Sequence, residues 1–381
     1  MRTAQTPRAF FVPAWSGFIL LQKEFAVGRI EYIQCGRAEA RALAMGSASG
    51  AEGRAARPAA KPGISGSHLK RLEERDMNRI PEGVYPVMIT PFTDENAIDW
   101  PAVDGIVEFY ARMGCQGIFA VCQSSEMFCL SEDERVLLAE RVARASAGRM
   151  CVVASGHVSE KLGDQIRELT RISRTGVDAV VMISNRLAGQ DESDETAIKN
   201  MNAILDALPG VTFGMYECPH PFKRPLTDRL LEAMAESGRF AFIKDTCCSA
   251  PVIAHRMGVL RGSVQLFNAN AATLLESLRD GAAGFSGIMA NYHPDLYVWL
   301  TGHFRDQPER ARRLAAALSV LSAAEGHCHP VCTKDHMNRS GVPMKLHTRS
   351  RDEREYGELD RHFIEDLMVV EDALRAQIPE K

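Results

Sequence analysis

The residue best suited to covalent chemistry in this chain is a lysine that ends an apolar run. Lys244 follows the strand-like segment Phe240–Ile243. A lysine at the end of a buried parallel strand loses hydration, which disfavours the ammonium and favours the free amine. Because a free amine attacks carbonyl carbons, Lys244 is a candidate Schiff-base nucleophile. Taken alone, the residue also fits a simpler interpretation, a lysine that reaches past its strand into water.

A tyrosine ends a second apolar run earlier in the chain. Tyr216 closes the segment Val211–Met215. If both runs are neighbouring strands of one parallel sheet, the phenol and the amine of Lys244 project from the same rim. A phenol beside an amine can donate and accept protons during carbonyl chemistry.

A polar turn follows a third apolar run and leads into a helix. The turn reads Cys122-Gln123-Ser124-Ser125-Glu126. Two hydroxyls, an amide and backbone N–H groups in a strand-to-helix turn can bind a carboxylate or an enolate oxygen. An ordinary turn is the alternative for this segment by itself.

These residues need a scaffold that brings several strand ends together. Short apolar runs alternate with longer amphipathic segments from Gly83 onward, a pattern typical of parallel strands joined by crossover helices. The predicted strands are 84–89, 117–121, 151–154, 179–183, 212–216, 240–243, 264–267 and 283–288. The predicted helices include 100–113, 131–147, 161–174 and 194–208. Ser131 with Glu134 forms a capping-box pattern at the start of the second helix.

Eight such units predict an α/β fold, a (β/α)8 TIM barrel, in which reactive groups gather at the carboxyl ends of the strands. No Gly-rich dinucleotide fingerprint follows the first strand. The barrel is expected over 77–305, with a C-terminal helical extension over 306–381. Residues 1–76 lack periodicity in their Arg-, Ala- and Gly-rich part, and we interpret them as a disordered or mis-annotated N-terminal extension that precedes a natural start at Met77.

Composition excludes several classes of partner. The formal charge of -4 gives no electrostatic footprint for nucleic acid or an anionic membrane, and no apolar stretch is long enough to span a bilayer. Ten dispersed cysteines in 381 residues do not form a disulfide scaffold. We therefore expect a cytoplasmic protein with a small-molecule partner.

With these residues in hand, the segment from Pro81 to about Pro343 resembles the dihydrodipicolinate synthase and N-acetylneuraminate lyase family of pyruvate-dependent class I aldolases. Residues 83–92 resemble the family's first strand, and the turn 122–126 stands where the family has Gly-Thr-Thr-Gly-Glu. Residues 216–219 replace its Tyr-Asn-x-Pro motif, 243–245 match its Schiff-base lysine motif, and 281–287 resemble its Gly-rich eighth-strand loop.

The resemblance implies a role for each matching residue. Lys244 would form an imine with pyruvate or a related 2-oxo acid, Tyr216 would shuttle protons, and Ser124 would hold the carboxylate. The implied substrate-binding residues are Gln123, Ser124, Ser125, Ser286 and Gly287. Neither a metal nor a cofactor is implied, and the expected partner besides the 2-oxo acid substrate is a further copy of the chain, in a homotetramer or homodimer.

Four departures from the family pattern bear on the substrate. No tyrosine occurs in 184–187, where the family's second tyrosine is expected. The arginine that recognises the aldehyde carboxylate in synthases is absent, with Lys223 and Arg224 nearby as substitutes. Glu217 replaces a neutral amide, and if it faces the site it disfavours anionic groups. Both glycines of the second-strand motif are replaced, by Cys122 and Ser125.

Two further groups of polar residues are candidates. The segment His327–Cys332, with Asp335 and His336 close behind, has metal-ligand residue types but also fits a loop between helices. Four polar residues at predicted strand ends are candidates to contact the variable part of the substrate: His157, Asn268, Asn270 and Asn291.

The sequence thus predicts a Schiff-base carbon–carbon lyase or aldolase that acts on pyruvate or a 2-oxo sugar acid. Two alternatives stay open: 4-hydroxy-tetrahydrodipicolinate synthase, which joins pyruvate and aspartate semialdehyde, and a non-catalytic 2-oxo acid sensor.

Overall fold

The computed structural model describes residues 79–378. The prediction for residues 1–76 lies outside the described residues, and the boundary near residue 305 stays a prediction. Within the described range no helix is both long and apolar enough to cross a membrane.

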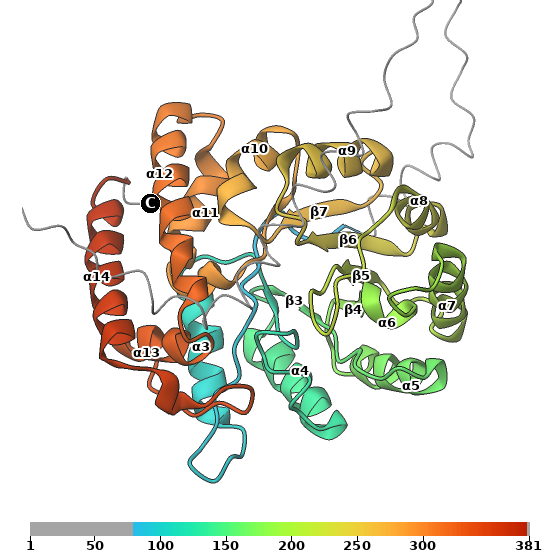
Figure 1. The fold of residues 1–381 in the computed structure, drawn as a ribbon, viewed down its shortest axis with the longest axis horizontal. Coiled ribbons are helices and arrows are strands. Elements are labelled where there is room, and N and C mark those ends of the chain that lie inside the picture. Colours follow the sequence, from blue (N-terminus) through green and yellow to red (C-terminus); the bar gives the residue numbers. More distant parts are fainter. Residues whose placement is uncertain (1–78, 379–381) are drawn as a thin grey trace, which may run out of the picture. The chain divides into compact units, whose positions relative to one another are not determined.

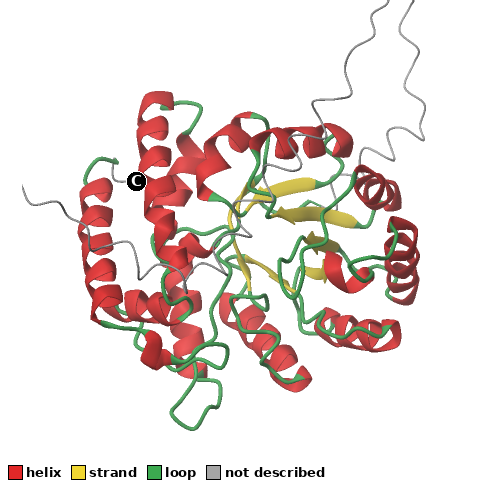
Figure 2. Cartoon of the chain, in the orientation of Figure 1, coloured by secondary structure: helices red, strands yellow, loops and turns green. Residues whose placement is uncertain are grey.

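Eight parallel strands of the described region form one sheet, in the order β1-β8-β7-β6-β5-β4-β3-β2. The strands are β1 Gly83–Val84, β2 Gly117–Phe119, β3 Cys151–Ala154, β4 Ala179–Ile183, β5 Phe213–Tyr216, β6 Phe240–Asp245, β7 Gln265–Asn268 and β8 Gly284–Phe285. A parallel bridge between Val87 and Phe119 joins the two ends of this order. The sheet therefore curls into a barrel with helices around it, as Figures 1 and 2 show, and the predicted TIM-barrel class is confirmed.

The helices alternate with the strands and then continue past the eighth. They are α3 Trp100–Arg112, α4 Glu132–Ser146, α5 Leu162–Ser173, α6 Ser184–Leu187, α7 Asp194–Ala207, α8 Asp228–Ser237, α9 Ala250–Leu260, α10 Leu274–Arg279, α11 Pro294–His303, α12 Pro308–Leu321, α13 Val331–Arg339 and α14 Glu358–Arg375. Short 3-10 helices are η1 Ala271–Thr273, η2 Ile288–Asn291, η3 Ser322–Gly326 and η4 Glu353–Glu355.

Local sequence explains where several elements begin and end. The capping box predicted for α4 is present: Glu134 N donates to Ser131 Oγ at 3.2 Å, and Ser131 N donates to Glu134 Oε2 at 2.8 Å. The first predicted strand, 84–89, is wrong in its extent, because Pro86 has no N–H to continue the ladder and β1 ends at Val84. The eighth is also shorter than predicted, and η2 begins at Ile288.

The barrel interior is filled by side chains. Every residue of β4 is buried, as expected for a strand covered on both faces. Gly214 illustrates the close packing, because a Cβ at this position would lie 2.3 Å from the ring of Phe242. A residue with a side chain would displace Phe242 from β6, the strand that carries Lys244.

The last helices lie beside the barrel, at the left of Figure 1. A buried carboxylate on α14 bonds to two histidines of neighbouring segments. Glu371 contacts His293 Nδ1, just before α11, at 2.8 Å and His336 Nε2, on α13, at 3.0 Å. Between α12 and α13 the chain returns to the barrel mouth, where η3 contacts η2.

Candidate active site

Lys244 and Tyr216 lie side by side at the carboxyl ends of β6 and β5. The two residues are register partners, and the Lys244 Nζ is 4.0 Å from the centre of the tyrosine ring. A register shift between Phe213 and Gly214 produces this pairing: Phe213 faces Phe240, but Gly214 faces Phe242. The irregularity thus brings the amine opposite the phenol.

The environment of Lys244 favours the free amine. The side chain is buried among apolar groups, including Phe119, whose ring centre is 5.9 Å from Nζ. Burial lowers the pKa of Lys244 below its ordinary value. At a given pH a larger part of the lysine population is then deprotonated, and only the free amine attacks a carbonyl.

The polar turn after β2 brings Gln123 to the tyrosine. The Tyr216 hydroxyl donates to Gln123 Oε1 at 3.5 Å, and the Cys218 thiol lies 3.5 Å from the same oxygen. The amide oxygen of Gln123 therefore lies within reach of both the phenol and the thiol.

Ser125 is bonded into the turn itself, contrary to the role implied for it. Its hydroxyl lies 2.6 Å from Met88 O and 2.7 Å from Ala120 O, and it accepts from Cys122 N at 3.1 Å. The side chain is fully buried. Ser125 thus fixes the backbone of the turn and has no donor left for a ligand, because its one proton is shared between two carbonyls.

Ser124 differs from Ser125 because its hydroxyl meets a ring from the far end of the chain. Its Oγ lies 3.3 Å from His329 Nε2. Through this contact Ser124 links the turn after β2 to the loop before α13.

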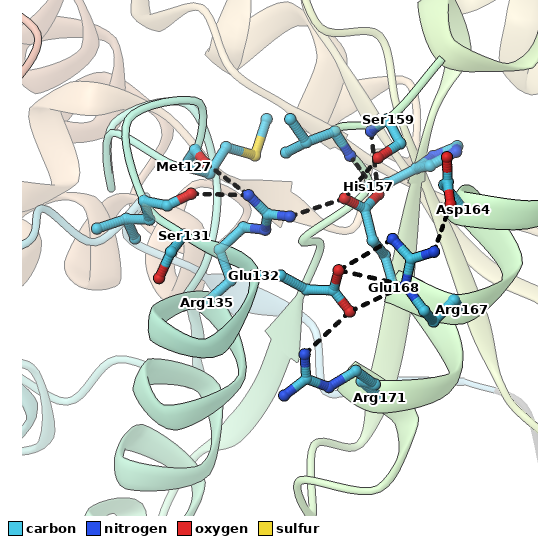
Figure 3. A network of polar contacts seen from close by, with 12 residues as sticks. Met127, Ser131, Glu132, Arg135, His157, Ser159, Asp164, Arg167, Glu168 and Arg171 are labelled. Carbon is cyan, nitrogen blue, oxygen red and sulfur yellow. Dashed lines mark hydrogen bonds and ion pairs between the residues drawn. The ribbon is translucent and has the colours of Figure 1, made fainter. Parts of the chain in front are cut away.

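The end of the turn is anchored by two charged networks. Glu126 adopts a left-handed conformation, with φ of 58°, and its Oε2 accepts from the backbone N–H groups of Arg349 and Ser350 at 2.7 and 2.6 Å. Arg135 on α4 donates to Leu130 O at 2.8 Å and to Glu168 on α5 at 2.7 Å (Figure 3). The turn is therefore held by both its own helix and the C-terminal segment.

Glu217 does not face the site. Its carboxylate accepts from Arg256 Nη2 at 2.7 Å, and Asp245 accepts from Arg256 Nη1 at 2.5 Å. Burial raises the pKa of Glu217, but the charges of Arg256 and Lys223 outweigh this effect, so its pKa lies below the ordinary value. The repulsion of anions that would follow from a site-facing Glu217 does not apply, because alternation along β5 turns this side chain away from Tyr216.

The two cations considered as substitutes for the missing arginine are engaged elsewhere. Lys223 Nζ donates to Thr246 O at 2.8 Å, and Arg224 binds Asp194 at 2.9 Å and the carbonyl of Gly189 at 2.9 Å. Where a tyrosine was expected after β4, the chain forms α6, and Asn185 Nδ2 donates to Cys218 O at 2.9 Å. Lys223 and Arg224 are thus held by protein partners.

The loop after β8 brings Ser286 and Gly287 to the same rim. Ser286 is buried and its N–H donates to Asn268 O at 2.9 Å. A Cβ at Gly287 would lie 2.4 Å from the Phe285 ring and 2.5 Å from Ala269 O, so only glycine fits there. Their contact with substrate stays a prediction.

Several other candidates have partners within the protein. The rim residues predicted to contact substrate use their side chains to hold loops: His157 bonds Ile183 N and Gln165, Asn268 bonds Thr273 and Ser277, Asn270 caps η1, and Asn291 bonds Val87 O. The candidate metal ligands also bond to different protein groups. His327 bonds to Asp360, Cys332 to Tyr292 and His336 to Glu371. In the part of the chain that the structure describes, no three such side chains are arranged to hold a metal ion.

Sequence reasoning missed Glu325. This residue lies on η3, and its charge interacts with that of Lys244. Burial raises the pKa of Glu325 to about 7, while Lys244 acts in the opposite direction. No motif distinguishes the Ala-Ala-Glu-Gly stretch around it, so only the path of the C-terminal segment could have identified it.

Comparisons with known proteins agree with this geometry. The model of the dihydrodipicolinate synthetase family matches residues 80–351. A 4-hydroxy-tetrahydrodipicolinate synthase from Marinobacter nauticus is 23% identical over 77% of this chain and 98% of its own length. An N-acetylneuraminate lyase from Rhizobium meliloti is 26% identical over 62% of this chain and 77% of its own.

Solved structures share the fold. The chloride-inhibited dihydrodipicolinate synthase from Acinetobacter baumannii, in complex with pyruvate, superimposes with a TM-score of 0.70 at 18% identity. The alignment covers 77% of this chain and 99% of the other.

Proposed function

The chain belongs to the dihydrodipicolinate synthetase family, and we propose on this basis that it is a carbon–carbon lyase or aldolase that forms an imine between Lys244 and pyruvate or another 2-oxo acid. The observation that carries the proposal is the desolvated Lys244 amine 4.0 Å from the centre of the Tyr216 ring. The synthase and lyase relatives named above support the same reaction class.

The reaction follows from the chemistry of the two side chains. Lys244 Nζ attacks the ketone carbon, and loss of water gives an iminium bonded to that carbon. In a longer 2-oxo acid the C4 hydroxyl gives its proton to the Tyr216 phenolate left by imine formation, and the iminium accepts the electron pair of the bond between C3 and C4, so an aldehyde leaves and an enamine forms. The reverse sequence makes the bond. Tyr216 donates a proton to the departing hydroxyl during imine formation and takes one during hydrolysis. No cofactor enters this scheme.

The second substrate is the point on which a synthase and another aldolase differ. A synthase for aspartate semialdehyde needs a cation for the aldehyde's carboxylate, and both Lys223 and Arg224 are bonded to protein groups. A carboxyl, Glu325, lies near Lys244 instead. We therefore favour a 2-oxo acid with a neutral, hydroxylated remainder, such as a 2-oxo sugar acid, over the synthase substrate.

Borohydride trapping with pyruvate tests the imine directly. We expect a reduced pyruvyl adduct on the peptide that contains Lys244, no adduct in Lys244→Ala, and an unchanged adduct in Lys199→Ala, whose lysine is exposed on α7. An unmodified Lys244 after incubation with pyruvate and several longer 2-oxo acids would refute the assignment. A panel of hydroxylated aldehydes, compared with aspartate semialdehyde, then separates the two substrate classes.

We further propose a cytoplasmic homotetramer or homodimer. The family resemblance supports the oligomer, and the cysteine usage supports a reducing compartment. Light scattering coupled to size exclusion measures the assembly, and a mass equal to one chain at micromolar concentration would contradict it.

A further inference from the structure

The loop between η3 and α13 brings a histidine from the end of the chain against the turn after β2. His329 Nε2 lies 3.3 Å from Ser124 Oγ, although 205 positions separate the two residues. The histidine is the only residue of the segment 327–332 for which the structure gives a contact with the turn after β2. This contact is independent of the elements that carry Lys244 and Tyr216.

Hydrogen bonds behind the histidine assign its tautomer. Thr333 Oγ1 donates to the Tyr292 hydroxyl at 2.8 Å, so the threonine oxygen accepts from His329 Nδ1 at 2.8 Å. The Nδ1 atom therefore carries the proton, and Nε2 presents its lone pair to Ser124. Ser124 in turn donates its hydroxyl proton to Nε2. A serine that donates to a neutral imidazole, with the imidazole oriented by a third group, is the arrangement in which a hydroxyl passes protons.

On the Tyr216 side of the site the turn after β2 offers an amide in place of a hydroxyl. The Tyr216 hydroxyl meets the amide oxygen of Gln123, which accepts a hydrogen bond but does not carry a proton onward at neutral pH. Gln123 therefore does not serve as a hydroxyl relay. Ser124, the residue after Gln123, contacts the imidazole of His329.

We propose that Ser124 and His329 form the proton relay for the C3 carbon of the bound 2-oxo acid. His329 acts through Ser124 and is therefore a positioning residue. It orients the hydroxyl and holds its proton while the enamine exists. This inference rests on the imine chemistry proposed above and names the groups that move the C3 proton.

Each atom of the relay step is accounted for. A C3 proton of the iminium passes to Ser124 Oγ while the Ser124 proton passes to His329 Nε2. The C3–H electron pair forms the double bond between C3 and C2, and the electron pair of the C2=N bond moves to the nitrogen, which gives the enamine. Return of the proton from the imidazolium through Ser124 restores the iminium, so the enzyme ends the cycle unchanged.

The charges around the ring keep it neutral in the unliganded protein. Burial lowers the pKa of His329 to about 4, and the positive charges of Lys334 and Arg351 act in the same direction. A bound carboxylate beside Ser124 opposes these two charges and raises the basicity of the ring. Glu325, four positions earlier, is the competing base, because burial raises its pKa to about 7.

Exchange of the pyruvate methyl protons measures the step without any second substrate. In D2O the relay exchanges its proton with solvent, and deuterium enters the methyl group, which proton NMR follows. The same samples are trapped with borohydride to count the Lys244 adduct. The variants are His329→Gln, His329→Ala and Glu325→Gln, with His327→Gln as the matched control, since His327 contacts Asp360 and stacks on Phe363.

We expect both His329 variants to exchange at least about 100-fold more slowly than the wild type while trapping changes less than about threefold. The His327 variant keeps both signals, and in Glu325→Gln exchange falls no further than trapping does, because its carboxyl interacts with Lys244 but is no part of the relay. Normal exchange in a His329 variant overturns the relay, as does loss of exchange in Glu325→Gln alone. Parallel loss of trapping and exchange in both His329 variants also overturns it, because His329 would then be needed for the site itself. Absence of the adduct in the wild type refutes instead the imine reaction on which the relay depends.

Discussion

Removal of Arg256 tests how the ends of β5 and β6 are held. The change Arg256→Met keeps most of the side-chain volume but leaves Glu217 and Asp245 buried without the guanidinium that contacts both, at 2.7 and 2.5 Å. Breaking one buried ion pair by removing a partner costs about 3 to 5 kcal/mol. Lys223 stays 3.7 Å from Glu217 and compensates part of the loss, so we expect the low end of this range.

The assay is urea unfolding at one fixed protein concentration. With a slope of about 3 kcal/mol per molar urea, a loss of about 3 kcal/mol lowers the midpoint by roughly 1 M. Arg167→Met is the matched control, because Arg167 also contacts two carboxylates but its side chain is 53% exposed. Exposed pairs contribute up to about 1 kcal/mol, so the control should lower the midpoint by no more than about 0.3 M.

The pH dependence supplies a second criterion. The pKa of Glu217 in the folded wild type lies below its ordinary value, so its contribution to stability is present above the unfolded pKa and is lost as pH falls through the folded pKa. In the variant burial dominates, the folded pKa rises, and protonation relieves the penalty. The gap between wild type and variant should therefore shrink from pH 7 to pH 4. A midpoint shift no larger than that of Arg167→Met, or a gap that does not change with pH, would refute the reasoning.

Three further predictions concern the turn, the eighth loop and the lysine. Ser125→Ala leaves the buried carbonyls of Met88 and Ala120 without their donor and should lower the free energy of unfolding in urea by about 1 to 3 kcal/mol. Ser124→Ala should instead alter the kinetics with little change in stability. Equal stability losses in the two variants would contradict this division. Gly287→Ala should destabilise by about 1 to 3 kcal/mol because its Cβ meets Phe285 and Ala269, while Gly258→Ala, in open space on α9, should stabilise by up to about 1 kcal/mol; the opposite order would be inconsistent with the packing. The rate of imine trapping should rise with pH through an inflection below the ordinary lysine pKa of 10.5, because only the free amine attacks; an inflection at or above 10.5 would show that Lys244 is not desolvated.

The sequence by itself determined the barrel and the neighbouring positions of Lys244 and Tyr216 at its strand ends. Apolar runs of strand length and the amphipathic segments between them are patterns of residues close together in the sequence. A single sequence therefore shows them directly. Lys244 and Tyr216 were identifiable because each ends such a run, and parallel strands align their ends. The orientation of Glu217, which follows the last residue of β5, was left open by the sequence and became clear from its contact with Arg256.

Only the tertiary structure decided which polar groups remain for a ligand. Ser124 and Ser125 are adjacent and alike in the sequence, but Ser125 bonds carbonyls of Met88 and Ala120 while Ser124 meets His329. A hydrogen bond between residues 205 positions apart leaves no local pattern, because its geometry depends on the summed path of every helix and loop between them. Glu325 could not be identified from the sequence for the same reason. The desolvation of a side chain depends on the groups that pack around it in the folded protein, and the neighbouring sequence does not record them.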